Sequence, residues 1–240
     1  MLLAGDIGGT KANLVLFSAE KIIKEAAVPC EKYKSLAELL KDFLAEQKVQ
    51  KACFALAGPL AADGKHCRLT NIDWTVDAFV LQRELNIEKV FLLNDLVANG
   101  YGLSGLSAAD FYELKQGGAC GHQALMSVGT GLGETFLLQQ QNKLLPFASE
   151  GGHCDFAPRD EREIELLRFL QKTFGHVSYE RLLSGEGLRL LYGFLTGEEA
   201  PAPQEISQRA LAGNPTCCEV VSWFFSLLAA EAGNLVLKFL

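Results

Sequence analysis

Short apolar segments joined by a glycine-rich turn form the start of the chain. Residues 2–7 and 12–17 are apolar runs, with a Gly-Gly-Thr turn at 8–10 between them. Apolar runs of this length around a short glycine-rich turn are typical of a β-hairpin. A third run at 21–28 predicts one more strand beside this hairpin.

The pattern then changes to the period of an amphipathic helix. Leucine or phenylalanine recurs at 36, 39, 40, 43 and 44, which is one face of a helix, and Ser35 is a suitable N-cap. Further on, 51–57 and 89–93 predict strands, 75–85 predicts a helix, and Asn94-Asp95 opens a short helix. Three antiparallel strands followed by alternating helices and strands predict an α/β domain.

The second half repeats the opening pattern once and is otherwise helical. Apolar segments at 124–128 and 135–139 flank another glycine-rich turn. Further helices are expected around 164–174, where Ile164, Leu167, Leu170 and Phe174 share one face, at 205–212, and from 216 onward.

The two halves are expected to be separate domains. The segment Leu-Ser-Gly-Leu-Ser-Ala at 103–108 is suited to a hinge between them. We therefore expect a first α/β domain at 1–106 and a second, larger one at 107–240.

Composition narrows the class of protein. Of the 240 residues, 49% are hydrophobic and 21% charged, which excludes wholesale disorder. The net charge is −7 and no basic block stands out, so nucleic acid and an anionic membrane surface are not expected partners. Residues 220–230 carry no charge, but this run falls short of the roughly 20 apolar residues of a membrane span. It predicts a helix buried on most sides. Seven cysteines without a CxxC pair predict reduced thiols in the cytoplasm.

The first candidate site is the segment 5–10, Gly-Asp-Ile-Gly-Gly-Thr. Its glycines would let the backbone approach a ligand closely, and successive N–H groups there can hold an anion. Asp6 at the strand end can bind Mg²⁺, usually through water. The alternative is an ordinary hairpin turn in which Asp6 bonds its own backbone.

The second candidate is the segment 129–133, Gly-Thr-Gly-Leu-Gly. A dinucleotide fingerprint would need glycine at position 134, where this chain has Glu134, and a helix rather than a strand after it. A P-loop is excluded as well, because 9–11 has the wrong order and spacing of residues. What remains is a second glycine-rich hairpin. Two such hairpins, one in each half, could hold a polyphosphate from both sides.

Two further groups of polar residues follow predicted strands or lie in tight loops. Asn94 and Asp95 come directly after a buried strand, where ligands bind in α/β sheets, although Asp95 could simply cap the next helix. Glu150 and His153 enclose a Gly-Gly pair, which predicts a tight loop offering acceptors to a polyol, or else a solvated surface loop. By its position in a helix before an arginine, Glu180 alone predicts only a surface or ion-paired glutamate.

Taken together, these motifs become specific. GDIGGT, AGP, LTN-x-x-W, LLND, VGTGLG, EGGH-x-DFAP and GHVS-x-ERLLSG-x-G occur in this order along essentially the whole chain. The chain thereby resembles the bacterial glucokinase family, the hexokinase-like branch of the actin-like ATPase sugar kinases. It lacks the Cys-rich zinc motif of the repressor–ORF–kinase branch. The resemblance implies a two-domain actin-like ATPase (ribonuclease H-like) α/β fold, with glucose deep in an interdomain cleft and MgATP above it.

The resemblance also implies roles for individual residues. Asp95 would be the general base that accepts the proton of the glucose 6-hydroxyl as that oxygen attacks the γ-phosphate of ATP. The implied phosphate loops are Gly5, Asp6, Ile7, Gly8, Gly9 and Thr10, with Asp6 toward Mg²⁺, and Gly129, Thr130, Gly131 and Gly133. The implied sugar ligands are Asn94, Asp95, Glu150, His153 and Glu180, with Asn71 lining the same pocket.

One departure from the family concerns the end of the sequence. Members continue after the equivalent of 233–235 with a strand, an adenosine motif containing paired glycines, and a closing helix. No Gly-Gly pair follows 151–152 here, so we expect a C-terminally truncated, incomplete second domain. The expected function is cytoplasmic, ATP-dependent phosphorylation of glucose, or of mannose or a related hexose, by a homodimer. The alternatives are a catalytically impaired sugar-binding or regulatory protein and, less well supported, an assembly protein on the actin-like fold.

Overall fold

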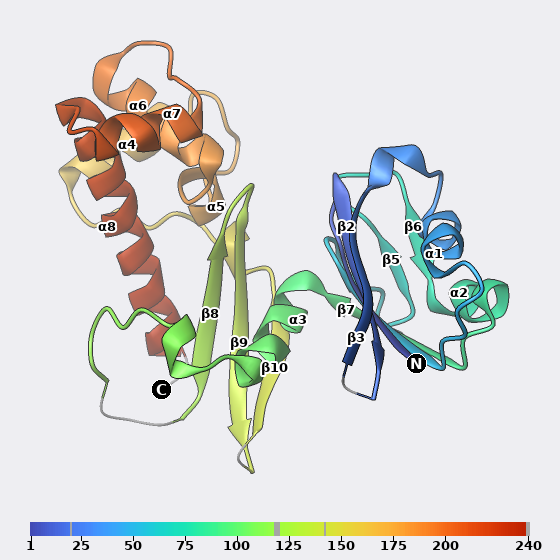
Figure 1. The fold of residues 1–240 in the computed structure, drawn as a ribbon. Helices are drawn as coiled ribbons and strands as arrows, with labels where there is room; N and C mark the ends of the chain where they lie inside the picture. Colours follow the sequence, from blue (N-terminus) through green and yellow to red (C-terminus); the bar gives the residue numbers. More distant parts are fainter. Residues whose placement is uncertain (20, 118–120, 142, 239–240) are drawn as a thin grey trace. The chain divides into compact units, whose positions relative to one another are not determined.

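The computed structural model describes residues 1–19, 21–117, 121–141 and 143–238 (Figure 1). Cys120, one of the seven cysteines, lies outside this range. The chain forms two compact units, Met1–Ser107 and Ala108–Leu240, and each unit has a hydrophobic core of its own.

Unit 1 is built on a five-stranded sheet with the order β3-β2-β1-β4-β7. The five strands expected from the sequence are confirmed: β1 (Leu2–Ile7), β2 (Lys11–Ser18), β3 (Lys21–Pro29), β4 (Lys51–Leu56) and β7 (Lys89–Asn94). The first three strands are antiparallel, whereas β4 is parallel to both β1 and β7. Ile7 pairs with Leu56, and Leu56 pairs with Asn94, so three strands end together at one edge of the sheet.

The helices of unit 1 begin where side chains cap them. The predicted helix α1 (Leu36–Leu44) is confirmed, and the hydroxyl of Ser35 accepts a hydrogen bond from the Glu38 N–H at 3.2 Å. It packs its buried leucines and Phe43 into the unit 1 core. After β7 comes α3 (Asp95–Gly102), followed by 3₁₀ turns at Leu103–Gly105 and Ala108–Asp110; another such turn, Cys30–Lys32, follows β3.

The predicted start of the next helix at residue 75 is wrong. Thr75–Asp77 form a short strand, β6, which pairs with β5 (His66–Arg68), and α2 covers Ala78–Leu85. Asp77 is extended, and its carboxylate accepts hydrogen bonds from the N–H groups of Phe79 and Val80 at 2.7 and 3.1 Å. This cap fixes the first turn of α2 and leaves the preceding residues free to pair as a strand.

Removing this cap should cost about 1 kcal/mol of unit 1 stability, the usual value for an N-cap aspartate. The variant is Asp77→Ala, which leaves two N–H groups of α2 without a side-chain acceptor. Urea unfolding can be followed by fluorescence of Trp74, which is buried in unit 1, in a background where Trp223 is replaced by phenylalanine. An unchanged unfolding midpoint would contradict the capping role.

Unit 2 contains a three-stranded antiparallel sheet with the order β10-β9-β8. Strands β8 (Gln123–Val128) and β9 (Leu132–Gln140) enclose the second glycine-rich turn, as predicted. Strand β10 (Lys143–Ser149) was not predicted. It contains Pro146 and lacks a clear alternation of buried and exposed positions, features tolerated in an edge strand but weak as a sequence signal.

Helices make up the rest of unit 2. They are α4 (Glu161–Leu170), α5 (Tyr179–Leu182), α6 (Gly185–Thr196), α7 (Pro203–Leu211) and α8 (Pro215–Lys238), preceded by a 3₁₀ turn at Gly151–His153. Figure 1 shows α8 running from the group of α4, α6 and α7 down alongside β8. The predicted inner face of α4 is partly wrong: the helix ends at Leu170, and Leu166 is fully buried. Glu163 is buried on that face because Arg159 forms an ion pair with it.

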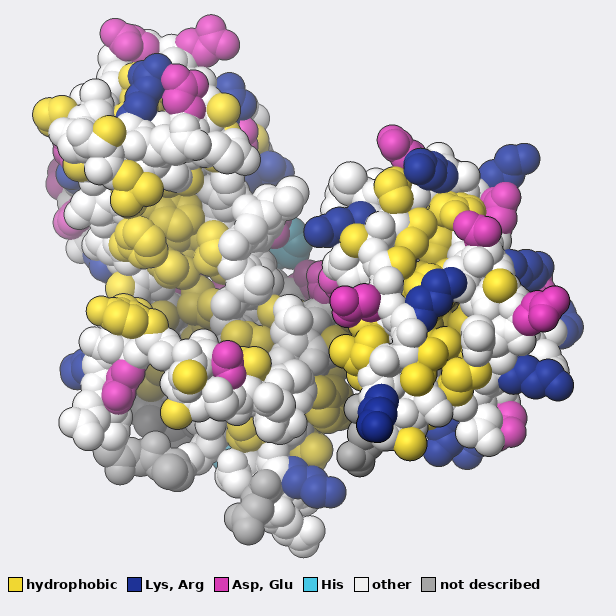
Figure 2. All heavy atoms as spheres, viewed as in Figure 1, with side chains coloured by type: hydrophobic (Ala, Val, Ile, Leu, Met, Phe, Trp, Pro, Cys, Tyr) yellow, Lys and Arg dark blue, Asp and Glu magenta, His cyan; other side chains and the backbone are white. Residues whose placement is uncertain are grey.

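The expectation that the apolar C-terminal helix is buried on most sides is also wrong. Only 33% of the most apolar stretch of α8 is buried, on one face, while Phe225, Val236 and Leu237 are exposed. Figure 2 shows hydrophobic side chains gathered on the surface where α8 runs. Its length and composition would allow α8 to cross a membrane, a weak criterion that core helices of soluble proteins also meet.

Candidate functional site

The first glycine-rich turn is held tightly at the edge of the unit 1 sheet. The N–H of Gly8 donates to the carbonyl of Lys11 at 3.0 Å. A Cβ at Gly9 would lie 2.5 Å from the Cβ of Asn71, so only glycine allows these two segments to approach. The turn and the Leu-Thr-Asn motif are therefore adjacent, as expected if both belong to one site.

Not every residue of the 5–10 segment faces a ligand in the same way. Gly5 is buried, and a Cβ there would press on side-chain carbons of Leu14 and Phe54, so its glycine serves sheet packing. Ile7 is fully buried in the core, which leaves only its backbone for a ligand. Asp6 points to the opposite, exposed face of the strand, and the Asn13 amide donates a hydrogen bond to it at 3.2 Å.

Asn94 and Asp95 lie at the same edge of the sheet, because β7 ends level with β1. Asn94 is the N-cap of α3, and its side-chain oxygen accepts hydrogen bonds from the N–H groups of Leu96 and Val97 at 3.0 and 3.3 Å. The cap role considered for Asp95 thus belongs to its neighbour. Asp95 is the first residue of the helix, and its Oδ1 accepts a hydrogen bond from the Leu96 N–H at 2.9 Å.

The pKa of Asp95 is raised above its ordinary value. Partial burial is the main cause, hydrogen bonds from Leu96 act against it, and the negative charge of Asp6 raises it further. The same electrostatic influence indicates that the Asp6 and Asp95 carboxylates lie near each other. A carboxylate in this environment is a stronger base than an exposed one.

In unit 2, the second glycine-rich turn is tied to Glu180. The Glu180 Oε2 accepts a hydrogen bond from the N–H of Leu132 at 3.1 Å, immediately after the turn. A Cβ at Gly131 would come well inside 3.0 Å of that same oxygen, a separation that real Cβ atoms essentially never show. Glu180 is therefore not the plain surface glutamate that its local sequence indicated. Its partner is 48 residues away in sequence, so local pattern carries no signal of it.

The loop at 150–153 brings a histidine between two carboxylates. The His153 Nδ1 lies 3.5 Å from Oε1 of Glu180, and its Nε2 lies 3.7 Å from Oε2 of Glu150. Glu150 and His153 are well exposed, while Glu180 is about one-third exposed. The three predicted sugar ligands of unit 2 thus form one cluster, with donors and acceptors open to a polyhydroxylated ligand. We call residues 150–153 the sugar loop.

The sugar loop depends on its two glycines. A Cβ at Gly152 would collide with the carbonyl of Leu132, and a Cβ at Gly151 would collide with the carboxylate of Glu134. The loop thus packs directly on the first residues of β9. On its other side, Asp155 forms a β-bridge with Ser178, close to Glu180.

Comparison with known proteins assigns the family. The family model "Glucokinase" matches residues 3–240. The glucokinase of Trichormus variabilis is 36% identical over an alignment covering all of this chain and 81% of that protein. This chain belongs to the glucokinase family. It spans about four-fifths of the length of that relative.

Solved structures agree with the glucokinase assignment. The glucokinase of an Antarctic psychrotroph matches with a TM-score of 0.83 and 29% identity, over 99% of this chain and 79% of that one. The glucokinase of Balamuthia mandrillaris in complex with glucose matches with a TM-score of 0.79 and 23% identity, over 99% and 76%. The predicted α/β sugar-kinase fold is confirmed.

The start of α6, near the second glycine-rich turn, was given no role in the sequence analysis. The N–H of Gly185, the first residue of α6, donates to the carbonyl of Gly129 at 3.0 Å. Ser184 caps this 12-residue helix by accepting a hydrogen bond from the Gly187 N–H at 3.2 Å. The N-terminus of α6, which carries a partial positive charge, is thereby fixed beside the turn. The signal was the Ser-Gly-x-Gly run before an apolar helix.

Proposed function

We propose that this chain transfers the γ-phosphoryl group of ATP to the 6-hydroxyl of glucose, with Asp95 as general base. Membership of the glucokinase family supports the reaction. The observation that supports the base is the position of Asp95 directly after the parallel strand β7, half buried, with a raised pKa. The Leu96 N–H holds the carboxylate in a fixed orientation. Asp95 would take the hydroxyl proton as the oxygen attacks phosphorus.

We propose two groups of hexose ligands. Asn94 and Asp95 come from unit 1, and the cluster of Glu150, His153 and Glu180 comes from unit 2. Carboxylates and an imidazole can accept and donate hydrogen bonds to several sugar hydroxyls at once. Their contribution to the rate would be orientation, because phosphoryl transfer depends mainly on alignment and charge stabilisation.

The two glycine-rich turns are proposed to hold the phosphates of ATP. Each turn contains glycines that would let a phosphate approach the backbone closely, and α6 begins beside the second turn. Asp6 fits a magnesium ion, because its carboxylate is exposed, and Mg²⁺ usually takes one or two carboxylates together with waters and substrate phosphates. When bound, Mg²⁺ would neutralise charge on the transferring phosphoryl group. Among the described residues, no group of three histidine, cysteine or acidic side chains forms a metal cage.

We propose the cytoplasm as the compartment of this protein. ATP and glucose are both cytoplasmic metabolites for a kinase, and the six described cysteines are all free thiols, typical of a reducing compartment. The homodimer and the absence of nucleic-acid and membrane partners stay predictions.

The test is a coupled assay for glucose 6-phosphate with MgATP, together with thermal unfolding at increasing glucose. We expect turnover with glucose and a rise of Tm with glucose, because a ligand stabilises the state that binds it. Thermal stabilisation without turnover would favour the sugar-binding regulatory alternative. If glucose causes neither turnover nor thermal stabilisation, both the kinase proposal and the sugar-binding alternative are refuted.

A further inference from the structure

A buried carboxylate lies beneath the sugar loop and has no partner among the described residues. Glu134, on β9, is 1% exposed, and neither of its carboxylate oxygens has a hydrogen-bond partner there. Glu231, on α8, is also 1% exposed, and its Oε1 has no hydrogen-bond partner among the described residues. Burying an acidic group without hydrogen bonds is costly, so natural proteins retain such groups rarely.

Glu134 touches the backbone of the sugar loop. It pairs across the sheet with Ser149, the last residue of β10 before the loop. The Ser149 hydroxyl accepts a hydrogen bond from the Gly151 N–H at 2.9 Å. The Glu134 Oε2 occupies the space that a side chain of Gly151 would need. The carboxyl group is therefore directly under the turn that carries Glu150 and His153.

Two charged groups face Glu134. From α8 come Glu231 and Lys238, whose Nζ lies 3.9 Å from Oε1 of Glu231. Tyr179 of α5 lies near Glu231, and its hydroxyl accepts a hydrogen bond from the Asn234 amide at 3.1 Å. Asn234 also donates to Oε2 of Glu231 at 2.8 Å. Tyr179 directly precedes Glu180 in α5, so the chain connects this cluster to a second proposed sugar ligand.

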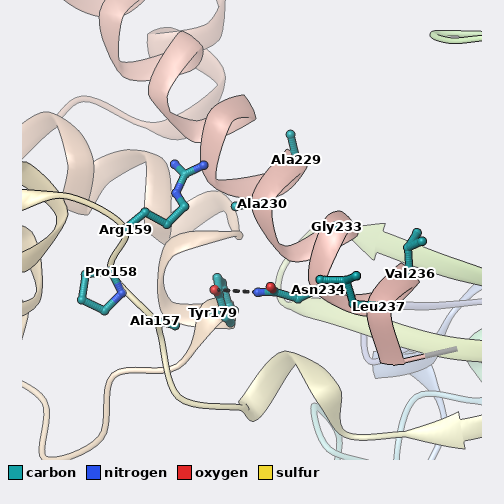
Figure 3. Close-up of a pocket in the computed structure, with 10 residues that line it drawn as sticks. All are labelled: Ala157, Pro158, Arg159, Tyr179, Ala229, Ala230, Gly233, Asn234, Val236 and Leu237. Carbon is teal, nitrogen blue, oxygen red and sulfur yellow. Dashed lines mark hydrogen bonds between the residues drawn. The ribbon is translucent and has the colours of Figure 1, made fainter. Parts of the chain in front are cut away.

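Burial, more than the neighbouring charges, favours a proton on Glu134. Burial raises the pKa of Glu134 to about 7, the charge of Glu231 adds to this, and Lys238 opposes it. A groove of about 660 Å³ opens beside the cluster (Figure 3). Tyr179 and Asn234 line this groove.

We propose that the Glu134 carboxyl positions the sugar loop from below, and that loss of its proton weakens the hold of the loop on hexose. The inference rests on the proposed hexose site. With the proton present, Glu134 is neutral and does not repel Glu231. Without it, the carboxylates of Glu134 and Glu231 repel each other, and Glu134 lies directly against Gly151 of the 3₁₀ turn Gly151–His153. The loop then changes conformation, and Glu150 and His153 move with it.

The test is the dissociation constant of glucose, measured by isothermal titration calorimetry between pH 6 and pH 8.5 on the full chain. We expect the parent to lose affinity as the pH rises through about 7, on the order of threefold to tenfold for one buried charge next to the site. Glu134→Gln, which is always neutral, should lose most of this dependence. Histidine also exchanges protons in this range, so the decisive quantity is the difference between the two profiles.

A second variant keeps the inference testable if Glu134→Gln does not fold. Glu231→Gln removes the charge that favours the proton on Glu134, so it should move the midpoint of the profile to lower pH. Glu165→Gln, an exposed glutamate on α4, should keep the parental profile as a matched control. Profiles of Glu134→Gln or Glu231→Gln that coincide with the parent would overturn the inference. Failure of the parent to bind glucose at every pH would instead refute the proposed function, and the inference with it.

The contact itself can be tested by a double-mutant cycle. Gly151→Ala should weaken glucose binding, because its Cβ collides with the Glu134 carboxylate. Adding Glu134→Ala removes that carboxylate, so the double variant should bind better than the two single effects predict together. Strictly additive effects would show that Glu134 does not act through Gly151.

Discussion

Asp95→Asn should lower kcat for glucose phosphorylation by about 100-fold to 10,000-fold, the range for loss of a general base. The affinity for glucose should change by less than about tenfold, because an amide still forms hydrogen bonds with a hydroxyl group. The amide oxygen of asparagine can also keep the hydrogen bond from the Leu96 N–H, so α3 should begin as before. What the variant loses is the ability to take a proton.

The pH dependence of the parent provides a second signature of the same group. Burial and the charge of Asp6 raise the pKa of Asp95, so its basic form is lost on acidification at a higher pH than for an exposed aspartate. The rate should therefore fall as the pH drops through that pKa, and the residual rate of Asp95→Asn should lack this limb.

A matched control is Asp42→Asn in the same unit. Asp42 is exposed and accepts a hydrogen bond from the hydroxyl of Tyr33, which the amide oxygen of asparagine could still accept. Its kcat and its glucose affinity should equal those of the parent. If Asp95→Asn keeps near-parental turnover, the assignment of the base is wrong. If it loses glucose binding altogether, Asp95 is primarily a sugar ligand.

Much of the fold could be predicted because the relevant physics is local. The hairpin of β1 and β2 follows from two apolar runs around Gly-Gly-Thr, and α1 follows from its leucine spacing and Ser35. Asn94 and Asp95 could be placed at a sheet edge, because the carboxyl ends of parallel strands meet there. These features need only a few neighbouring residues to be recognised.

The remaining features depend on contacts distant in sequence. Glu180 has the sequence context of a surface glutamate, yet its partners are the Leu132 N–H and His153. Gly5 lies in a phosphate-loop motif, yet neighbouring side chains in the sheet already require it to be glycine. In the sequence, Glu134 served only to exclude a dinucleotide-binding motif at residues 129–134. Its burial under the sugar loop depends on the packing of three separate segments. Periodicity carries no information about such encounters.

Gly152→Ala is expected to have the largest effect on the stability of unit 2. Its Cβ would collide with the carbonyl oxygen of Leu132 and lie 3.1 Å from the carbonyl carbon. These are backbone atoms of β9, which cannot move without disturbing the sheet and the Leu132 N–H bond to Glu180. We expect a loss of about 3 kcal/mol, the upper end of the usual cost of overpacking, and a glucose affinity reduced at least about tenfold, since a misplaced ligand group forfeits its hydrogen bonds.

The contrast between glycines makes this prediction specific. Gly175→Ala introduces the same methyl group where no atom lies within 4 Å and should change stability by less than about 0.5 kcal/mol. Gly151→Ala meets the end of a flexible side chain rather than backbone, so it should cost less than Gly152→Ala. Urea unfolding followed by the fluorescence of Trp223, with Trp74 replaced by phenylalanine, reports on unit 2. If Gly152→Ala unfolds at the same midpoint as Gly175→Ala, the sugar loop does not rest on β9. In that case, close packing between the glycine-rich segments of unit 2 and Glu180 cannot be what positions the proposed sugar ligands.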